Sequence, residues 1–343
     1  MIKKTFKYRQ ETFHFQGSEK CSIMRSIEAS GQFYEADFLK AIERHTDSKK
    51  WVVDVGAHIG NHTIYWAKAQ GMKVLAFEAN PASYRLLKEN LEKNGVAKLV
   101  SALNTAVGSE AGFVTLTPLE SEDPGTFSMM RPTNKASFQC KVVKLDDYLN
   151  YFETRVPGII KIDVEGAEEK VIRGALKTLQ MHRPVVTTEV MKAEEVESIG
   201  ELLAPLGYRP IGIYNSTPTV VWSAMTPGSS GKGNPYQELL QIVRYGVTAG
   251  MHSIAAQHMT RNLQKQLKVV EGRIEVISTD KTPKLSATVP KKVKAKPKAA
   301  AKQKAVKTVK KTATSKKSSS VSPKPKTKVT PPMPEKKKQT KTK

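Results

Sequence analysis

The sequence predicts an α/β fold in which a mostly parallel, doubly wound sheet is covered by helices on both faces. Short apolar runs alternate with amphipathic stretches of helical period along residues 51–224, and turn residues separate them. This alternation is typical of parallel sheets, because each strand needs a crossover helix before the next. With 343 residues and 39% hydrophobic residues, the chain is long enough for one such domain with appendages.

The first half of this region alternates regularly. Residues 1–50 form a mixed helical and extended segment, with one amphipathic helix expected near Phe33–Arg44. A later helix is expected to begin after Asn80-Pro81 and to end near Asn94-Gly95, since proline suits a first helical turn and glycine a helix end. The expected strands are Trp51–Val55, Lys73–Phe77 and Leu99–Leu103, and the expected helices are Thr63–Gln70 and Ser83–Asn94.

The second half begins with a change of pattern. Two extended segments, Phe113–Thr117 and Phe138–Val143, flank a long loop over Leu119–Pro132 that is a candidate lid over the acceptor. Alternation then resumes and closes on a hairpin. The expected elements are strands Ile159–Ile162 and Val185–Val190, helices Ala167–Leu179 and Ala193–Leu206, and hairpin strands Tyr208–Tyr214 and Thr219–Ala224.

The C-terminal third differs in composition from the rest. The domain is expected over residues 51–226, and a linker with a helical extension (Tyr236–Val270) over 227–280. Residues 281–343 contain 22 lysines and one acid, so they carry +21 of the net charge of +24. Because this stretch has no aromatic residues and little apolar surface to bury, it is predicted to be a disordered basic tail.

Spaced lysines on an extended chain bind polyanions without sequence preference, by neutralising phosphates and releasing counterions. The tail is similar to the lysine-, alanine- and proline-rich tails of linker histones, and nucleic acid is the polyanion we favour for residues 281–343. The alternative is a tail that only solubilises the protein or attaches it to other anionic surfaces. Base stacking is not expected, because no aromatic residue is interleaved.

Cysteine usage and hydropathy bear on the compartment. The two cysteines, Cys21 and Cys140, have no CxxC or metal-like spacing. The basic N-terminus lacks an apolar run, and no stretch approaches the roughly 20 apolar residues of a membrane span. A cytoplasmic protein without a membrane span is expected.

A candidate cofactor site lies where the first predicted strand ends. Asp54 is followed by a glycine turn, Gly56-x-x-x-Gly60, and Glu78 ends the next strand. An acid at that place can accept hydrogen bonds from both ribose hydroxyls of an adenosine. A dinucleotide needs G-x-G-x-x-G to seat its pyrophosphate, and that spacing is missing. S-adenosylmethionine has no phosphate but has an amino group that Asp54 could hold, so the pattern favours this cofactor. Alternatively, these acids only end strands and cap helices.

Four blocks make a more specific resemblance. Asp54-Val-Gly-Ala-His-Ile-Gly-Asn-His-Thr63, Phe77-Glu-Ala-Asn-Pro81, Asn104-Thr-Ala-Val-Gly108 and Ile160-Lys-Ile-Asp-Val-Glu-Gly-Ala-Glu168 together resemble the FkbM family of methyltransferases. The resemblance implies a class I (Rossmann-like) fold with a seven-stranded sheet whose last strand is antiparallel. It also implies methyl transfer from S-adenosylmethionine, usually to hydroxyls of sugars and natural products. Its blocks add Ala57, His58, Asn61, Asn80, Asn104 and Ala106 to the candidate cofactor contacts; many members have Asn at the place of His58.

The acceptor side is expected on the same rim of the sheet. An alcohol must lose its proton during transfer, and a carboxylate beside it can take that proton. Asp163, Glu165 and Glu189 are the candidate catalytic residues, because each follows or ends a predicted strand there. The alternative for Asp163 is an N-cap, and Glu165 would also suit the positive end of a helix. No metal is expected, since carboxylates alone do not define a site, and Gly60 interrupts the His58–His62 spacing.

Three functions follow from these patterns. The favoured one is an O-methyltransferase acting on a hydroxyl of a sugar or related small molecule. The second is a nucleic-acid or nucleoprotein methyltransferase that uses the tail to bind its substrate. The third is a non-catalytic, polyanion-binding protein on a degenerate methyltransferase fold.

Overall fold

The computed structural model describes residues 1–118, 127–128 and 137–224. Most of the predicted lid over Leu119–Pro132, the helix over Tyr236–Val270 and the basic tail over residues 281–343 lie outside these ranges, as do the domain boundaries expected after residue 224. Within the described ranges, the helices are all too short or too polar to cross a membrane.

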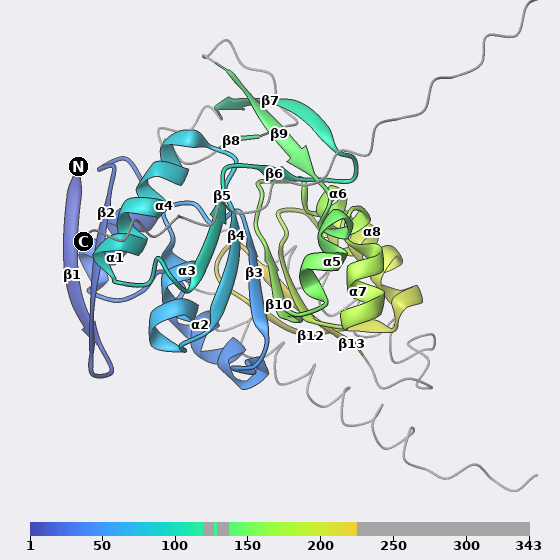
Figure 1. Cartoon of the computed structure of the whole chain (residues 1–343), viewed down its shortest axis with the longest axis horizontal. Coiled ribbons are helices and arrows are strands. Elements are labelled where there is room, and N and C mark those ends of the chain that lie inside the picture. The colour runs from blue at the N-terminus through green and yellow to red at the C-terminus, as the bar shows by residue number, and fades with distance from the viewer. Residues whose placement is uncertain (119–126, 129–136, 225–343) are drawn as a thin grey trace, which may run out of the picture. The chain divides into compact units, whose positions relative to one another are not determined.

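The main sheet has seven strands in the order β12-β13-β11-β10-β3-β4-β5 (Figure 1). Strands β11, β10, β3, β4 and β5 run parallel, while β13 runs antiparallel to both β11 and β12. This confirms the predicted fold class, including the antiparallel last strand and the closing hairpin. The strands are β3 (Trp51–Val55), β4 (Lys73–Phe77), β5 (Val100–Leu103), β10 (Pro157–Ile162), β11 (Val185–Glu189), β12 (Tyr208–Tyr214) and β13 (Thr219–Ala224).

Helices cover the two faces of this sheet (Figure 1). Successive strand residues point to opposite faces, so Val52 packs with one apolar cluster and Val53 with the other. The Val52 face is covered by α3 (Asn61–Ile64) and α4 (Pro81–Lys93); the Val53 face is covered by α5 (Leu149–Phe152), α6 (Glu168–Arg173), α7 (Leu176–His182) and α8 (Ala193–Leu203).

The prediction of a single helix over Ala167–Leu179 is wrong, because the chain forms α6 and α7 with a break at Gly174. A Cβ atom on Gly174 would lie 2.0 Å from the carbonyl oxygen of Gly108. The backbone of the helix therefore packs directly against the loop after β6, and the hydrogen-bond ladder is interrupted at this contact. The other predicted core helices are present, with ends displaced by a few residues.

The N-terminal segment contains a hairpin that the sequence patterns did not indicate. Strands β1 (Ile2–Tyr8) and β2 (Glu11–Gly17) pair antiparallel, followed by α1 (Ser22–Ser30) and α2 (Ala36–Ile42). The helix predicted near Phe33–Arg44 corresponds to α2 and the 3-10 turn Glu43–His45. We call this the N-terminal unit, residues 2–45. Its aromatic side chains pack in the core cluster that also contains residues of α3 and α4: Phe6, Phe13, Phe15, Phe33 and Phe38.

Buried asparagines fasten the N-terminal unit to the domain. The Asn90 amide of α4 accepts from the Gln16 N–H at 3.0 Å, and donates to the Gln16 carbonyl at 3.0 Å and the Ile59 carbonyl at 2.9 Å. Asn61 at the start of α3 forms the same two-way pairing with the backbone of Tyr34, both bonds 3.0 Å long. Because Ile59 belongs to the glycine turn after β3, the hairpin is tied to the predicted cofactor loop.

A second, smaller sheet lies at one end of the main sheet (Figure 1). It consists of β6 (Ala106–Val107), β9 (Phe138–Val143), β7 (Gly112–Pro118) and β8 (Phe127–Ser128) in that order. The two predicted extended segments are thus confirmed as β7 and β9. Since β6 follows β5 after two residues, this sheet is held close to the carboxyl ends of the parallel strands.

Candidate functional site

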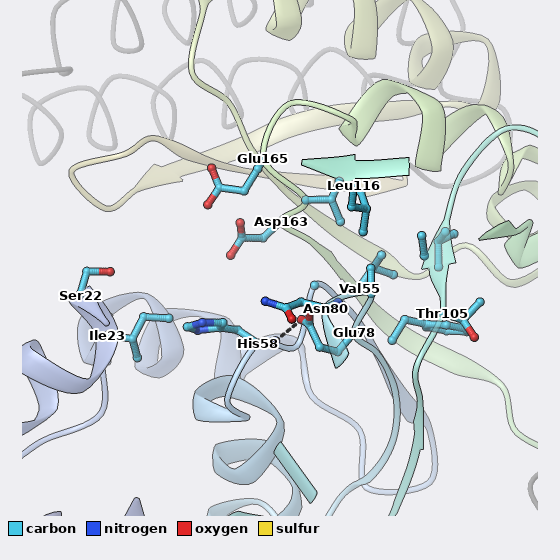
Figure 2. A pocket seen from close by; sticks show the side chains of 16 residues that line it. Ser22, Ile23, Val55, His58, Glu78, Asn80, Thr105, Leu116, Asp163 and Glu165 are labelled. Carbon is cyan, nitrogen blue, oxygen red and sulfur yellow. Dashed lines mark hydrogen bonds between the residues drawn. The ribbon is translucent and has the colours of Figure 1, made fainter. Parts of the chain in front are cut away.

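A pocket opens at the carboxyl ends of β3, β4 and β10, where a doubly wound sheet places its ligands. Its empty space is about 860 Å³ when the open mouth is included. Figure 2 shows Asp163 and Glu165 on one side, His58, Glu78 and Asn80 on another, and Ser22 and Ile23 of α1 at a third. The remaining lining residues are Val55, Gly56, Phe77, Ala79, Thr105, Ala106, Val107, Leu116 and Val164.

The glycine turn after β3 is shaped by its packing. Gly56 adopts a φ of +82°, and a Cβ there would lie 1.8 Å from the carbonyl oxygen of Asp163. Gly60 has a φ of +94°, and a Cβ there would meet Leu87 at 2.7 Å. The sequence reasoning expected these glycines to make room for a ligand. In the structure their missing side chains make room for the end of β10 and for α4.

Replacing Gly56 with Ala is expected to lower the free energy of unfolding by more than about 3 kcal/mol, because it adds backbone strain at positive φ to a backbone clash. Gly71→Ala is the matched control: Gly71 has a φ of +65° but nothing within 4 Å of the added Cβ, so strain alone should cost about 1–2 kcal/mol. Urea unfolding of both variants measures the difference. Equal losses of unfolding free energy in the two variants would show that the close packing of Gly56 against the Asp163 carbonyl does not constrain the turn.

Glu78 is held at the pocket by the loops on either side of it. One carboxylate oxygen accepts the His58 N–H at 2.7 Å and the other accepts the Asn80 N–H at 2.8 Å (Figure 2). Burial raises the pKa of this carboxyl to about 7, although the two backbone donors oppose the shift. Each oxygen keeps a further lone pair for a ligand hydroxyl. The Asn104 amide, which is outside the lining, donates to the Glu78 carbonyl at 2.8 Å and so fixes the same loop.

The acidic rim opposite Glu78 centres on Asp163. Asp163 and Glu189 share a hydrogen bond, and burial together with the charges of Asp163 and Glu165 raises the pKa of Glu189 well above its ordinary value. Burial also opposes ionisation of Asp163, but Lys161, the hydrogen bond with Glu189 and His62 outweigh it, so its pKa is lowered. The surroundings of the pair therefore favour a proton on Glu189 over one on Asp163.

Backbone strain also gathers at the pocket. His58 and Glu165 both have positive φ values, 50° and 57°, although neither is glycine. Such conformations cost roughly 1–3 kcal/mol and are concentrated at functional sites. They aim the two side chains from opposite loops toward the same space (Figure 2).

The structure brings about half of the predicted site residues to the pocket: Gly56, His58, Glu78, Asn80, Ala106, Asp163 and Glu165. Outside the lining are Asp54, Ala57, Gly60, Asn61, Asn104 and Glu189. The carboxylate of Asp54 is fully buried, where it accepts from the Thr63 hydroxyl and pairs with Lys161. Its predicted contact with an amino group stays a prediction. Among the described residues, no group of three His, Cys, Asp or Glu side chains has the geometry to hold a metal ion.

Sequence reasoning missed two groups of residues. Ser22 and Ile23 reach the pocket from an N-terminal unit that carries no recognisable motif. Lys161 is the second omission: it lies in a buried strand, and its partners lie on a neighbouring strand and beyond the strand end. The signal available for Lys161 was a charged residue within an apolar run, one residue before Ile162.

A family model described as a methyltransferase FkbM domain matches residues 54–210. The chain carries an FkbM methyltransferase domain. The match begins at the end of β3 and ends within β12, so it covers the pocket except for the N-terminal unit. The resemblance drawn from the four sequence blocks is thereby confirmed.

Known proteins similar to the FkbM domain include two curated relatives. The hexuronic acid methyltransferase AglP of Haloferax volcanii is 27% identical over 171 residues, which is 50% of this chain and 68% of that protein. The methyltransferase sdnD of Sordaria araneosa is 28% identical over 157 residues, 37% of this chain and 61% of that protein. A solved FkbM methyltransferase from Methylobacillus flagellatus has a TM-score of 0.37 and 17% identity, covering 51% of this chain and 44% of that one.

The cofactor of the FkbM domain is S-adenosylmethionine, as predicted, and the pocket fits this molecule. A buried carboxylate with spare lone pairs, Glu78, suits the ribose hydroxyls. Phe77, Val107 and Leu116 offer apolar surface next to it for a nucleoside base. The described lining residues include neither Lys nor Arg, so no cationic side chain there would pair with a phosphate.

Proposed function

We propose that the FkbM domain is an O-methyltransferase whose acceptor is a hydroxyl on a sugar or a related small molecule. The observation that carries the proposal is the Asp163 carboxylate on the pocket rim, 3.2 Å from Lys161 Nζ and opposite the carboxylate assigned to the cofactor ribose. A carboxylate there is placed to take the proton of an alcohol that enters from the open side.

The bound cofactor supplies a methyl group that is already activated by its sulfonium. S-adenosylmethionine held by Glu78 would supply the methyl carbon for the new bond to the acceptor oxygen, and its sulfur would leave with the electron pair of the broken carbon–sulfur bond. The hydroxyl proton passes to a carboxylate oxygen of Asp163. Holding the acceptor in line supplies much of the acceleration, since the reaction becomes intramolecular in effect. Glu165 and the wall formed by Ser22 and Ile23 are the residues that we assign to acceptor positioning.

The charge of the pocket narrows the class of acceptor. Glu78, Asp163 and Glu165 are acidic, and the described lining includes no Lys or Arg to pair with an anion. One relative is named for hexuronic acids, which are anionic. For this chain we propose a neutral sugar hydroxyl instead, because a carboxylate on the acceptor would face like charges at short range.

Transfer of a labelled methyl group to a panel of glycosides tests this function. Neutral methyl hexopyranosides are expected to react with a kcat/KM at least tenfold above that of the matching methyl hexuronides, which differ only by the carboxylate. Assays at several salt concentrations separate charge repulsion from poor steric fit. If repulsion is the cause, screening by salt should reduce the difference in kcat/KM between the neutral glycosides and the hexuronides. Preference for the hexuronides would contradict the proposed acceptor class, and transfer only to nucleic acid would favour the second function predicted from the tail.

A further inference from the structure

Lys161 is a buried ammonium group between the two halves of the site. It lies on β10 directly opposite Asp54 of β3 in the parallel register, and its side chain is only 6% exposed. Its Nζ donates to the Gly56 carbonyl at 2.8 Å, and lies 3.2 Å from Asp163 Oδ2 and 3.4 Å from Asp54 Oδ1. The Gly56 contact is a hydrogen bond, and the two carboxylate contacts are ion pairs; Asp54 Oδ1 is buried without a hydrogen-bond partner, so Lys161 supplies the positive charge beside it.

The three partners belong to different parts of the pocket. Gly56 belongs to the cofactor loop, Asp163 is the carboxylate of the acceptor rim, and Asp54 is fully buried behind both. Asp54 is itself held by Thr63 of α3, so the far end of the network is anchored in a helix. Lys161 therefore links the side chains at the end of β10 to the loop after β3, in addition to the backbone hydrogen bond from the Asp163 N–H to the Val55 carbonyl.

Stability alone does not account for this arrangement. Taking charges out of water costs several kcal/mol per ion, and buried ion pairs are often replaced by apolar residues without loss of stability. The residue of β10 that shares a face with Lys161, Ile159, is a fully buried apolar residue, so an apolar side chain would suit this face of the strand. We propose that Lys161 is a positioning residue, which holds the Asp163 carboxylate and the Gly56 turn at a fixed separation across the methyl-transfer site.

The electrostatics of the rim agree with this role. Burial acts to lower the pKa of Lys161, but the charges of Asp163 and Asp54 outweigh it and the pKa is raised, so the group stays cationic. Acidic neighbours would otherwise make Asp163 harder to ionise. The titratable groups that interact with the Asp163–Glu189 pair include Lys161, His62, Glu35, Glu165, Glu168 and Tyr34. Lys161 is the first of the charges that favour the ionised form of Asp163.

The test uses the full-length chain and two readouts that need no acceptor. The first is the Kd for S-adenosylhomocysteine by calorimetry. The second is the titration of the Asp163 carboxyl by ¹³C NMR, its signal identified by its absence in Asp163→Asn. Lys161→Met should raise the Kd for S-adenosylhomocysteine roughly tenfold or more, because the Gly56 carbonyl loses a charged hydrogen-bond donor. It should also raise the pH at which Asp163 titrates by roughly 1–3 units, because the nearby cation is gone.

Controls separate positioning from folding. Lys98→Met removes an exposed lysine before β5 and should change neither readout. If Lys161→Met fails to fold, Lys161→Met with Asp54→Asn removes the stranded carboxylate as well, and the same two shifts are expected. The wild-type protein gives a third check, because Asp163 should titrate below the ordinary range of an Asp and Glu189 above that of a Glu.

Unchanged affinity and an unchanged Asp163 titration in a folded Lys161 variant would overturn the proposal, as would an ordinary titration of Asp163 in the wild type. The inference builds on the proposed function, which gives Asp163 its place in the reaction. The experiments distinguish a failure of the proposed function from a failure of the Lys161 inference. If Asp163→Asn transferred methyl groups at the wild-type rate, Asp163 would lose its catalytic assignment, while both Lys161 measurements would still report on the position of the loop.

Discussion

Asp163→Asn should lower kcat by a factor of about 10² to 10⁴, measured with the best acceptor of the glycoside panel, because the acceptor loses its general base. Asparagine keeps the size of the side chain and still offers an oxygen to Lys161, which contacts Asp163 at 3.2 Å. The change therefore removes the capacity to take a proton and leaves most of the packing in place.

Binding separates this effect from damage to the site. Asp163 lines the pocket on the side away from Glu78, so the Kd for S-adenosylhomocysteine should change by less than about threefold while kcat falls. Glu169→Gln is the matched control, because Glu169 is a nearby carboxylate of α6 that pairs with Arg173 and does not line the pocket. It should leave kcat within about twofold of wild type. A kcat for Asp163→Asn within tenfold of wild type would show that another group takes the proton.

Glu78→Gln should raise the Kd for S-adenosylhomocysteine roughly 10- to 100-fold, because the ribose hydroxyls lose a charged acceptor. The variant also turns one amide N–H toward a backbone donor, since both carboxylate oxygens accept N–H groups, from His58 and Asn80. Glu92→Gln on the exposed side of α4 is the control and should bind like wild type.

In the wild-type protein, the affinity for S-adenosylhomocysteine should depend on pH through the ionisation of Glu78. Burial raises the pKa of Glu78 to about 7, so the acceptor form of the carboxylate predominates only above that pH. Affinity for S-adenosylhomocysteine should therefore rise by up to tenfold per pH unit between pH 5.5 and 7 and then level off. The same rise should be missing in Glu78→Gln. Because the pKa of Asp163 is lowered, kcat at saturating cofactor should stay flat over this range. An affinity that is independent of pH in the wild type would exclude Glu78 as the titrating group.

Much of the fold follows from local patterns. The strands β3, β4, β10 and β11 are short runs rich in branched apolar residues, and the two-sided burial of a parallel sheet makes such runs easy to recognise. Glu78 was predictable for a related reason, since its place at the end of β4 depends on strand length alone. These features need no knowledge of which distant segments meet.

The N-terminal hairpin was missed because its turn carries no recognisable signal. Arg9 adopts the left-handed conformation with a φ of 55°, where most hairpins use Gly, Asn or Asp. Lys4 further obscures the alternation of β1, because it lies on the same side of the strand as Phe6 and Tyr8. The break at Gly174 was missed for a different reason: it depends on contact with Gly108, which is far away in the sequence.

The site was only half predictable because its geometry depends on register. That Lys161 lies opposite Asp54 follows from the pairing of β3 with β10, two strands that are about a hundred residues apart in the chain. One residue of slip would turn Lys161 to the other face of the sheet. The actual role of Gly56 likewise becomes visible only when the end of β10 is in place.

The hydrogen bonds of Asn90 and Asn61 to the N-terminal unit decide which residues an expression clone or a chimera of this protein has to include. The family match starts at residue 54, yet Asn90 and Asn61 bind backbone groups that lie well before it. An expression clone trimmed to the match would uncover an aromatic surface that invites aggregation and would take away Ser22 and Ile23 at the pocket mouth. A chimera designed to acquire the acceptor specificity of this protein should therefore include the hairpin, α1 and the asparagines of α4 together.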